Sequence, residues 1–240
     1  MDGILLTAVA VATIALLSAL AYKCRCLTPA GAVASFAVGS VVALFGSFSA
    51  FLLLTVFTVA GFAATFAGMR MKKDKGIQEG AAGERDWKNV VGVGAPPCIV
   101  VLVNYFLDLD PTLFAVMFIS TITVAGADTI ASEVGAYGKK TYLITTMEPV
   151  EPGVNGGISA LGTSVSTLAS FLIALLGWYL LTGTVQLWFL IPFAAGVAGN
   201  LLDSLFGVLL EDRGHMSKYT NNASTAMIGA GLGSAMFMVI

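Results

Sequence analysis

Long, continuously apolar stretches dominate the chain, and short polar connections separate them. An α-helix needs about 20 apolar residues to cross the hydrocarbon core of a bilayer, and eight stretches approach or exceed this length. Transmembrane strands would instead alternate apolar and polar residues, which these stretches do not. We therefore predict an all-α, polytopic integral membrane protein with about eight transmembrane helices. The predicted spans are 3–22, 30–46, 49–69, 90–107, 112–137, 157–182, 187–210 and 222–240.

Composition excludes several other classes of protein. Hydrophobic residues make up 57% of the 240 residues and charged residues only 11%, whereas a soluble domain carries about 25% charged residues. This excludes a soluble globular enzyme, a disordered chain and a secreted disulfide scaffold. The net charge of -2 indicates no nucleic-acid partner. We expect a single transmembrane domain over residues 1–240, located in the cell membrane with multiple passes and surrounded by membrane lipids.

The basic residues indicate how the spans are oriented. All 12 Lys and Arg residues lie in four connections, and each of these follows an odd-numbered span. The positive-inside rule places these connections in the cytoplasm and both termini outside. The cytoplasmic loops lie near residues 70–89, 138–156 and 211–221. Chemistry on a water-soluble substrate is therefore expected on this side.

Two aspartates lie inside predicted spans, Asp128 in the fifth and Asp203 in the seventh. Each follows the start of its span by 16 residues, which places both ~24 Å from the outer edge at 1.5 Å per residue. A carboxylate at this depth costs several kcal/mol unless it is paired, hydrated or metal-bound. Ser132 shares a helix face with Asp128, and Asn200 shares one with Asp203. A shared Mg²⁺ site and simple interhelical hydrogen bonding are both open interpretations.

Glu133 is a third candidate acid, nearer the interface. The helical period places it ~140° around the helix from Asp128. A site role and a structural role are both open for this residue. At the cytoplasmic end of the last span, Asn222 either caps the helix or faces the site.

Two cytoplasmic loops carry groups suited to phosphate. Asn155, Gly156 and Gly157 precede the sixth span, where glycines let backbone N–H groups face an anion at a helix N-terminus. Lys139 and Lys140 lie earlier in the same loop and could neutralise phosphate charge. The alternative is a flexible loop that ends in an N-cap. The sequence has no Walker A motif.

The segment Arg70–Lys88 mixes bases and acids with glycine and tryptophan. Arg85 suits bidentate phosphate contact, and Lys88 and Asn89 follow it closely. A patch that binds anionic lipids is the alternative.

Taken together, these motifs resemble the membrane family that includes the plant phytyl-phosphate kinases of vitamin E biosynthesis and their archaeal and bacterial relatives. The block around Asp128 also resembles the nucleotide-site block of CTP-dependent polyprenol kinases. The matching stretches are 27–31 (LTPAG), 83–90 (GERDWKNV), 127–133 (ADTIASE), 155–159 (NGGIS), 199–204 (GNLLDS) and 221–222 (NN).

The resemblance implies a transferase that moves the γ-phosphoryl group of CTP, or of another nucleoside triphosphate, to a prenyl monophosphate and gives the diphosphate. It implies that Asp128, Asp203 and Glu133 handle metal and phosphate, with Mg²⁺ as the cofactor. It also implies that the positive side chains of Lys139, Lys140 and Arg85 bind phosphate. It assigns phosphate binding by a loop backbone to Asn155, Gly156 and Gly157.

The sequence leaves other functions open. One is a different lipid-directed CTP enzyme, a prenol kinase or a cytidylyltransferase, at the same site. Another is a transporter of small solutes or cations, which would place the acids near the midplane in interrupted helices. A homo-oligomer is compatible with the sequence, which does not fix the oligomeric state, the prenyl chain or the nucleotide.

Overall fold

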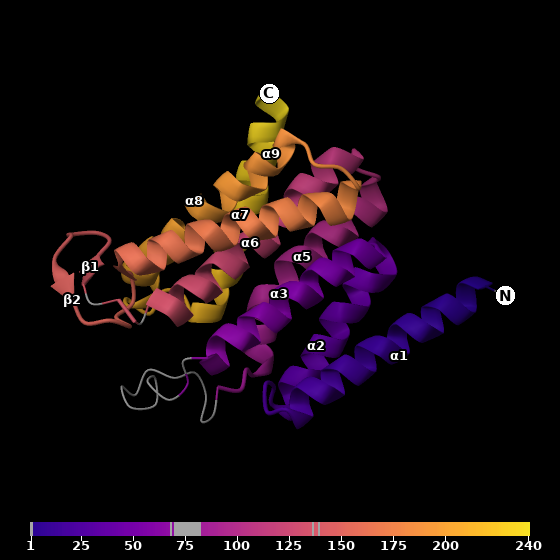
Figure 1. Cartoon of the computed structure of the whole chain (residues 1–240), viewed down its shortest axis with the longest axis horizontal. Helices are drawn as coiled ribbons and strands as arrows, with labels where there is room; N and C mark the ends of the chain where they lie inside the picture. The colour runs from indigo at the N-terminus through magenta and orange to yellow at the C-terminus, as the bar shows by residue number, and fades with distance from the viewer. Residues whose placement is uncertain (1, 68, 70–82, 136, 139) are drawn as a thin grey trace.

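The computed structural model describes residues 2–67, 69, 83–135, 137–138 and 140–240. Long helices account for most of them, and they follow the predicted spans to within a few residues (Figure 1). The elements are α1 (Asp2–Lys23), α2 (Pro29–Val41), η1 (Val42–Gly46), α3 (Phe48–Ala67), α5 (Trp87–Leu107), α6 (Pro111–Gly135), β1 (Thr141–Leu143), β2 (Pro149–Val150), β3 (Gly157–Ile158), α7 (Ala160–Thr182), η2 (Leu187–Phe189), α8 (Leu190–Phe206), η3 (Gly207–Glu211) and α9 (Lys218–Val239).

Polar N-caps start the helices that leave the loops with basic residues. Thr28 Oγ1 accepts from Gly31 N at 3.1 Å before α2, and Asp86 Oδ1 accepts from Asn89 N at 2.9 Å before α5. Ser159 and Ser217 cap α7 and α9 in the same way. Such caps satisfy backbone N–H groups that have no partner within the helix. They fix where each of these four helices begins.

Helix α6 forms the centre of the bundle. In its apolar window 72% of the residues are buried, against 17–33% in the other five candidate spans. It packs against α7, α8 and α9 on one side and against α3 and α5 on the other. The core around it contains Phe118, Ile119, Ile122 and Trp178. Helix α1 lies at the periphery and packs against α2 (Figure 1).

A small sheet folds the loop between α6 and α7 back onto the bundle. Strand β1 pairs antiparallel with β2 and with β3, in the order β2-β1-β3. The register places Tyr142 opposite both Pro149 and Ile158. Because β3 ends one residue before the Ser159 cap, the sheet fixes the approach to α7.

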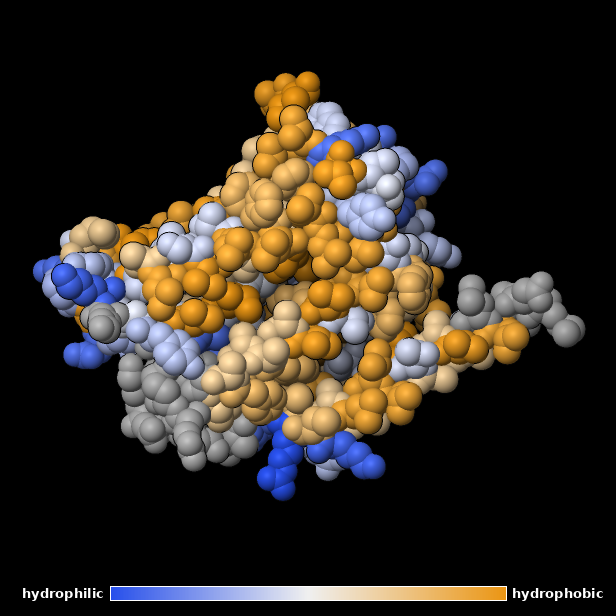
Figure 2. Space-filling view, viewed as in Figure 1, coloured by the Kyte–Doolittle hydropathy of each residue, from blue (hydrophilic) through white to orange (hydrophobic). Residues whose placement is uncertain are grey.

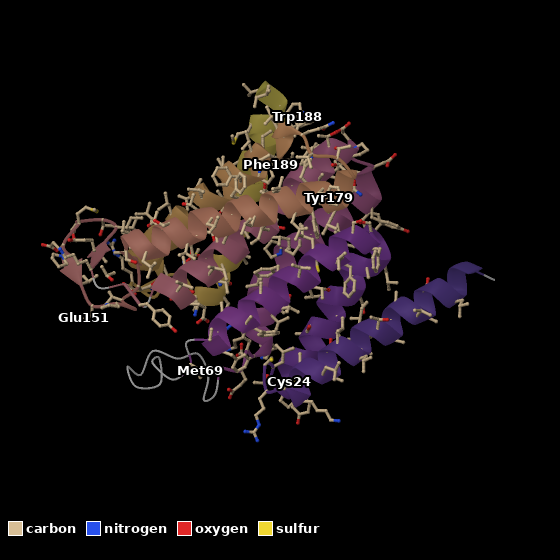
Figure 3. All side chains as sticks on the ribbon, viewed as in Figure 1. Cys24, Met69, Glu151, Tyr179, Trp188 and Phe189 are labelled. Carbon is tan, nitrogen blue, oxygen red and sulfur yellow. The ribbon has the colours of Figure 1, made fainter. Side chains whose placement is uncertain are left out.

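The two ends of the bundle differ as the charge pattern predicts. Figure 3 shows Cys24, Met69 and Glu151 toward one end, and Tyr179, Trp188 and Phe189 toward the other. The first end carries the loops with Lys and Arg, and we call it the basic end. Helix α1 begins and α9 ends away from it (Figure 1), consistent with both termini lying on one side. In Figure 2, apolar side chains cover most of the surface between the two ends.

Six helices of the described part are long and apolar enough to cross a membrane. The integral membrane architecture is therefore confirmed, whereas the count of eight is not. The apolar stretch of α1 is shorter, Thr7–Lys23, and α9 is not among the six. The polar start of α9 contributes to this, because its first five residues include Lys218, Asn221 and Asn222.

Candidate active site

A polar cavity of about 390 Å³ lies at the basic end. Its walls come from α6, α7, α8, η3, α9 and the loop that carries β3. Asp128 and Asp203 line it together, so the two membrane aspartates share one cavity, as the sequence predicts. Six other predicted site residues also line this cavity: Ser132, Asn155, Gly156, Gly157, Asn200 and Asn222.

The aspartates come from neighbouring helices that approach closely. Gly199 of α8 faces Val124 of α6, where an added Cβ would clash with the valine side chain. The carboxyl groups of Asp128 and Asp203 lie within hydrogen-bonding reach of each other. Thr225 Oγ1 of α9 donates to Asp203 Oδ1 at 3.2 Å. Two adjacent carboxylates repel each other unless a proton or a cation lies between them. This pair is therefore suited to bind either a proton or a cation.

Asparagine amides surround the acid pair. Asn200 is only 6% exposed, and its Nδ2 donates to Ser166 Oγ at 3.1 Å. Asn200 Oδ1 has no hydrogen-bond partner among the described residues. Asn221 Nδ2 donates to the backbone oxygen of Asp203 at 3.0 Å. Two carboxylates beside a buried amide oxygen that accepts no bond make an all-oxygen donor set, the kind that Mg²⁺ prefers.

Other residues that line the cavity are suited to an anion. Ser159, Gly162 and Thr163 bring the N-terminus of α7 to the cavity, where the helix dipole is positive. Ser159 Oγ caps this helix by accepting from Gly162 N at 3.0 Å. Lys218, the first residue of α9, adds a positive side chain. The lining thus combines acidic side chains with a lysine and a helix N-terminus.

The glycine loop is packed rigidly against the end of α8. Asn155 Nδ2 donates to Gly207 O at 3.3 Å and to Asp212 Oδ1 at 3.0 Å. Gly156 has φ +68°, and a Cβ there would collide with Val208. The side-chain amide of Asn155 therefore holds the loop in place, while the loop backbone lines the cavity.

Sequence reasoning missed two charged residues of this cavity, Glu211 and Lys218. Glu211 ends the π-helical turn η3 and is partly buried. A π-turn holds more residues per turn than an α-helix, so an α-helical period misplaces Glu211. The predicted loop near 211–221 includes Lys218, whereas in the structure Ser217 caps α9 and Lys218 is its first residue.

The structure separates Glu133 from the two aspartates. Glu133 is buried at 8% exposure and faces α3, where Thr65 Oγ1 donates to its Oε1 at 2.7 Å. Five residues of α-helix turn it ~140° away from Asp128. Within the described residues, no three His, Cys, Asp or Glu side chains are grouped closely enough to hold a metal.

Three of the predicted cations, Arg85, Lys88 and Lys140, lie outside the polar cavity. Arg85 Nη2 donates to Thr65 Oγ1 at 3.3 Å, and its guanidinium lies 5.7 Å from the Phe62 ring centre. Lys88 is exposed, with its Nζ 6.0 Å from the Trp87 ring centre. Lys140 is exposed and does not line the cavity, and Lys139 lies outside the described residues.

Arg85 and Asn89 line a second cavity instead, of about 470 Å³. This apolar cavity lies between α1, α2, α3 and α5. Its lining is almost entirely hydrophobic, unlike that of the polar cavity.

Comparison with known proteins places the chain among membrane proteins of archaea, bacteria and plants. It is 33% identical to the uncharacterized membrane protein MJ0933 of Methanocaldococcus jannaschii over 241 residues, which is 100% of this chain and 98% of that protein. It is 32% identical to the chloroplastic Protein VTE6 of Arabidopsis thaliana over 219 residues, 89% of this chain and 65% of that protein. Over 201 residues it is 32% identical to the uncharacterized membrane protein sll0875 of Synechocystis, 82% of this chain and 76% of that protein.

No solved structure matches the chain. Residues 12–233 match the family described as Integral membrane protein DUF92. This match covers most of the chain and confirms the resemblance that the motifs indicated. The chain therefore belongs to the DUF92 family of integral membrane proteins.

Proposed function

We propose that the chain is a prenyl-phosphate kinase that uses CTP and Mg²⁺ at the cytoplasmic face of the membrane. One observation carries the proposal. A single cavity at the basic end is lined by two membrane carboxylates, a helix N-terminus and a lysine. A nucleotide with a bound divalent cation has complementary charges, a positive ion on a negative phosphate chain. The resemblance of the motifs to phytyl-phosphate kinases supports the same assignment.

The proposed reaction requires little covalent chemistry from the protein. A phosphate oxygen of the prenyl monophosphate forms a bond to the γ-phosphorus of CTP. The bond from that phosphorus to the oxygen bridging the β-phosphate breaks, and CDP leaves with that oxygen. The attacking group is already an anion, so it needs no strong base. Positioning and charge neutralisation therefore provide most of the catalysis.

The polar cavity contains groups for both tasks. The N-terminus of α7 and Lys218 would bind phosphate oxygens of the nucleotide. Asp128, Asp203 and the Oδ1 atom of Asn200 would hold Mg²⁺. When bound, the cation would screen the repulsion between the two phosphate groups. Ser132 and Asn222 line the same cavity and would contact the nucleotide.

The structure gives less support to a transporter. That alternative places the acids near the midplane, in helices interrupted at the binding site. Here α6 is continuous from Pro111 to Gly135, and α8 is continuous from Leu190 to Phe206. The acids line a cavity at one end of the bundle.

The decisive experiment measures the product directly. The purified chain in lipid nanodiscs is incubated with geranylgeranyl phosphate or phytyl phosphate, with CTP or ATP, and with or without Mg²⁺. We expect prenyl diphosphate and nucleoside diphosphate in equal amounts, and only with Mg²⁺. A CDP-lipid, or phosphorylation of free prenol alone, would favour the related lipid-directed enzymes. Absence of diphosphate under every combination would overturn the proposal.

A further inference from the structure

The apolar cavity is larger than the polar one and is not used by the chemistry proposed above. Ten residues of α3 between Phe51 and Phe66 line it. Fifteen residue steps at 1.5 Å each make this wall ~22 Å long, most of the thickness of the hydrocarbon core. The cavity is therefore elongated along α3.

One end of this cavity carries its only charged residue among the described lining residues, Arg85. The Arg85 backbone is fixed between the first loop and α2, because its N–H donates to Cys26 O at 2.9 Å and its oxygen accepts from Thr28 N at 3.1 Å. Gly31 permits this approach, since a Cβ there would lie 2.5 Å from Arg85 O. Phe62 and Thr65 hold the guanidinium at the basic end.

The cavity suits a hydrocarbon chain, because its volume is about 470 Å³ and its lining is mostly apolar. Bilayer lipid is as apolar as the cavity wall, so burial of a chain brings little free energy by itself. Selection therefore depends on the charged end, where Arg85 suits a phosphate.

The charged end also lies beside α6. A Cβ added to Gly61 would lie 3.5 Å from Thr129 Cγ2 and 3.9 Å from Arg85 Nη2. Thr129 directly follows Asp128, whose side chain lines the polar cavity. A phosphate at Arg85 would therefore lie near the turn of α6 that carries the acid pair.

We propose that the apolar cavity holds the single isoprenoid chain of the lipid acceptor, with its phosphate at Arg85. This inference rests on the proposed function and assigns the second substrate of the same reaction to a separate cavity. The isoprenoid chain lies between α2 and α3, the nucleotide enters the polar cavity, and the two phosphate groups meet at the turn of α6 that carries Asp128 and Thr129.

The test uses a block in the cavity and a matched control on the same helix. Ser35 of α2 lines the cavity, whereas Val33, two residues earlier, is exposed and does not. Binding of geranylgeranyl phosphate and of the short dimethylallyl phosphate is measured on the full chain in nanodiscs without nucleotide. Ser35→Trp should weaken binding of the long chain at least tenfold and leave the short one unchanged. Val33→Trp should change neither.

Two further measurements keep the test decisive. Arg85→Gln should weaken binding of both lipids, because it removes the cation at the phosphate. A prenyl phosphate with a photoreactive group at its tail should label α1, α2, α3 or α5, which line the cavity, in the unmodified chain, independently of how any variant folds. Labelling confined to other helices, or unchanged affinity of Ser35→Trp for the long chain, would overturn the assignment. Binding without turnover in the unmodified chain would instead contradict the kinase proposal and leave the cavity assignment standing.

Discussion

The two cavities of this protein resemble each other in size and differ in almost everything else. They measure about 390 and 470 Å³, and each has charged residues near the basic end. The polar cavity is formed by α6, α7, α8, η3, α9 and the loop of β3, and three acids and the N-terminus of α7 line it. The apolar cavity is formed by α1, α2, α3 and α5, with one arginine. The difference teaches that a polar and an apolar cavity are built by separate halves of the sequence.

Asp128→Asn should give the largest difference between the two cavities, because it should lower turnover strongly and leave lipid binding unchanged. The amide keeps the shape of the side chain but loses the negative charge that attracts a cation. Diphosphate formation should fall by roughly 10²–10³-fold in kcat, the loss typical for removal of one preorganised electrostatic group. Binding of the lipid without nucleotide should stay as it is. Steady-state kinetics and the lipid-binding assay together measure both effects.

Asp110→Asn is the matched control on the same helix. Asp110 Oδ1 caps α6 at the opposite end by accepting from Thr112 N at 2.9 Å and from Leu113 N at 3.0 Å. Asparagine caps helices about as well as aspartate, so turnover and thermal stability should remain unchanged. Normal turnover of a folded Asp128→Asn variant would remove the acid pair from the mechanism.

Two lysines test whether the nucleotide is bound by the residue that lines the cavity or by the residue that the sequence predicted. Lys218 lines the polar cavity, whereas Lys140 is exposed outside it. Lys218→Ala should raise the KM for the nucleotide about tenfold, which corresponds to the lower end for a hydrogen bond to a charged group. Lys140→Ala should leave this KM nearly unchanged. The reverse order would show that the loop of Lys140 closes over the nucleotide during turnover.

The smallest effect is expected at the contact between the halves. Thr65 of α3 lies between Arg85 and Glu133, at 3.3 and 2.7 Å. Thr65→Val keeps the shape and removes the hydroxyl, so we expect the KM for the lipid to rise about fivefold, equivalent to about 1 kcal/mol. The KM for the nucleotide should not change. Initial rates at varied lipid and nucleotide concentrations measure both constants.

Thr58→Val is the comparison for this change within the apolar wall of the same cavity, because the Thr58 hydroxyl donates to Leu54 O of its own helix, at 2.8 Å, and does not bridge charged residues. It should leave both KM values as they are. Equal effects of the two variants would indicate general loosening of α3 and contradict a specific role for Thr65.

Much of the architecture could be predicted because membrane helices leave a strong sequence signal. Apolar runs placed the helices, and the depths of Asp128 and Asp203 predicted that they meet. The helical period also indicated that Glu133 faces away, although the family motif grouped it with the aspartates. Its placement against Thr65 shows that residues of one motif can serve different surfaces of a helix.

Other parts of the site depend on geometry that local patterns do not encode. The strands of the loop sheet are two or three residues long, too short for a recognisable alternation. The π-turn at Gly207–Glu211 brings Glu211 into the cavity against the α-helical period. The apolar cavity is formed by four helices whose residues, taken singly, read only as membrane-spanning.

The five-residue interval from Asp128 to Glu133 sets limits on how this protein can change. Deleting one residue within it would rotate one acid by ~100° relative to the other. Either Asp128 would turn away from the polar cavity or Glu133 would turn away from Thr65, and the displaced carboxylate would point into packed side chains. Insertions and deletions should therefore be tolerated in the connecting loops but not in this stretch of α6. The helical phase of this one segment thus constrains both halves of the molecule.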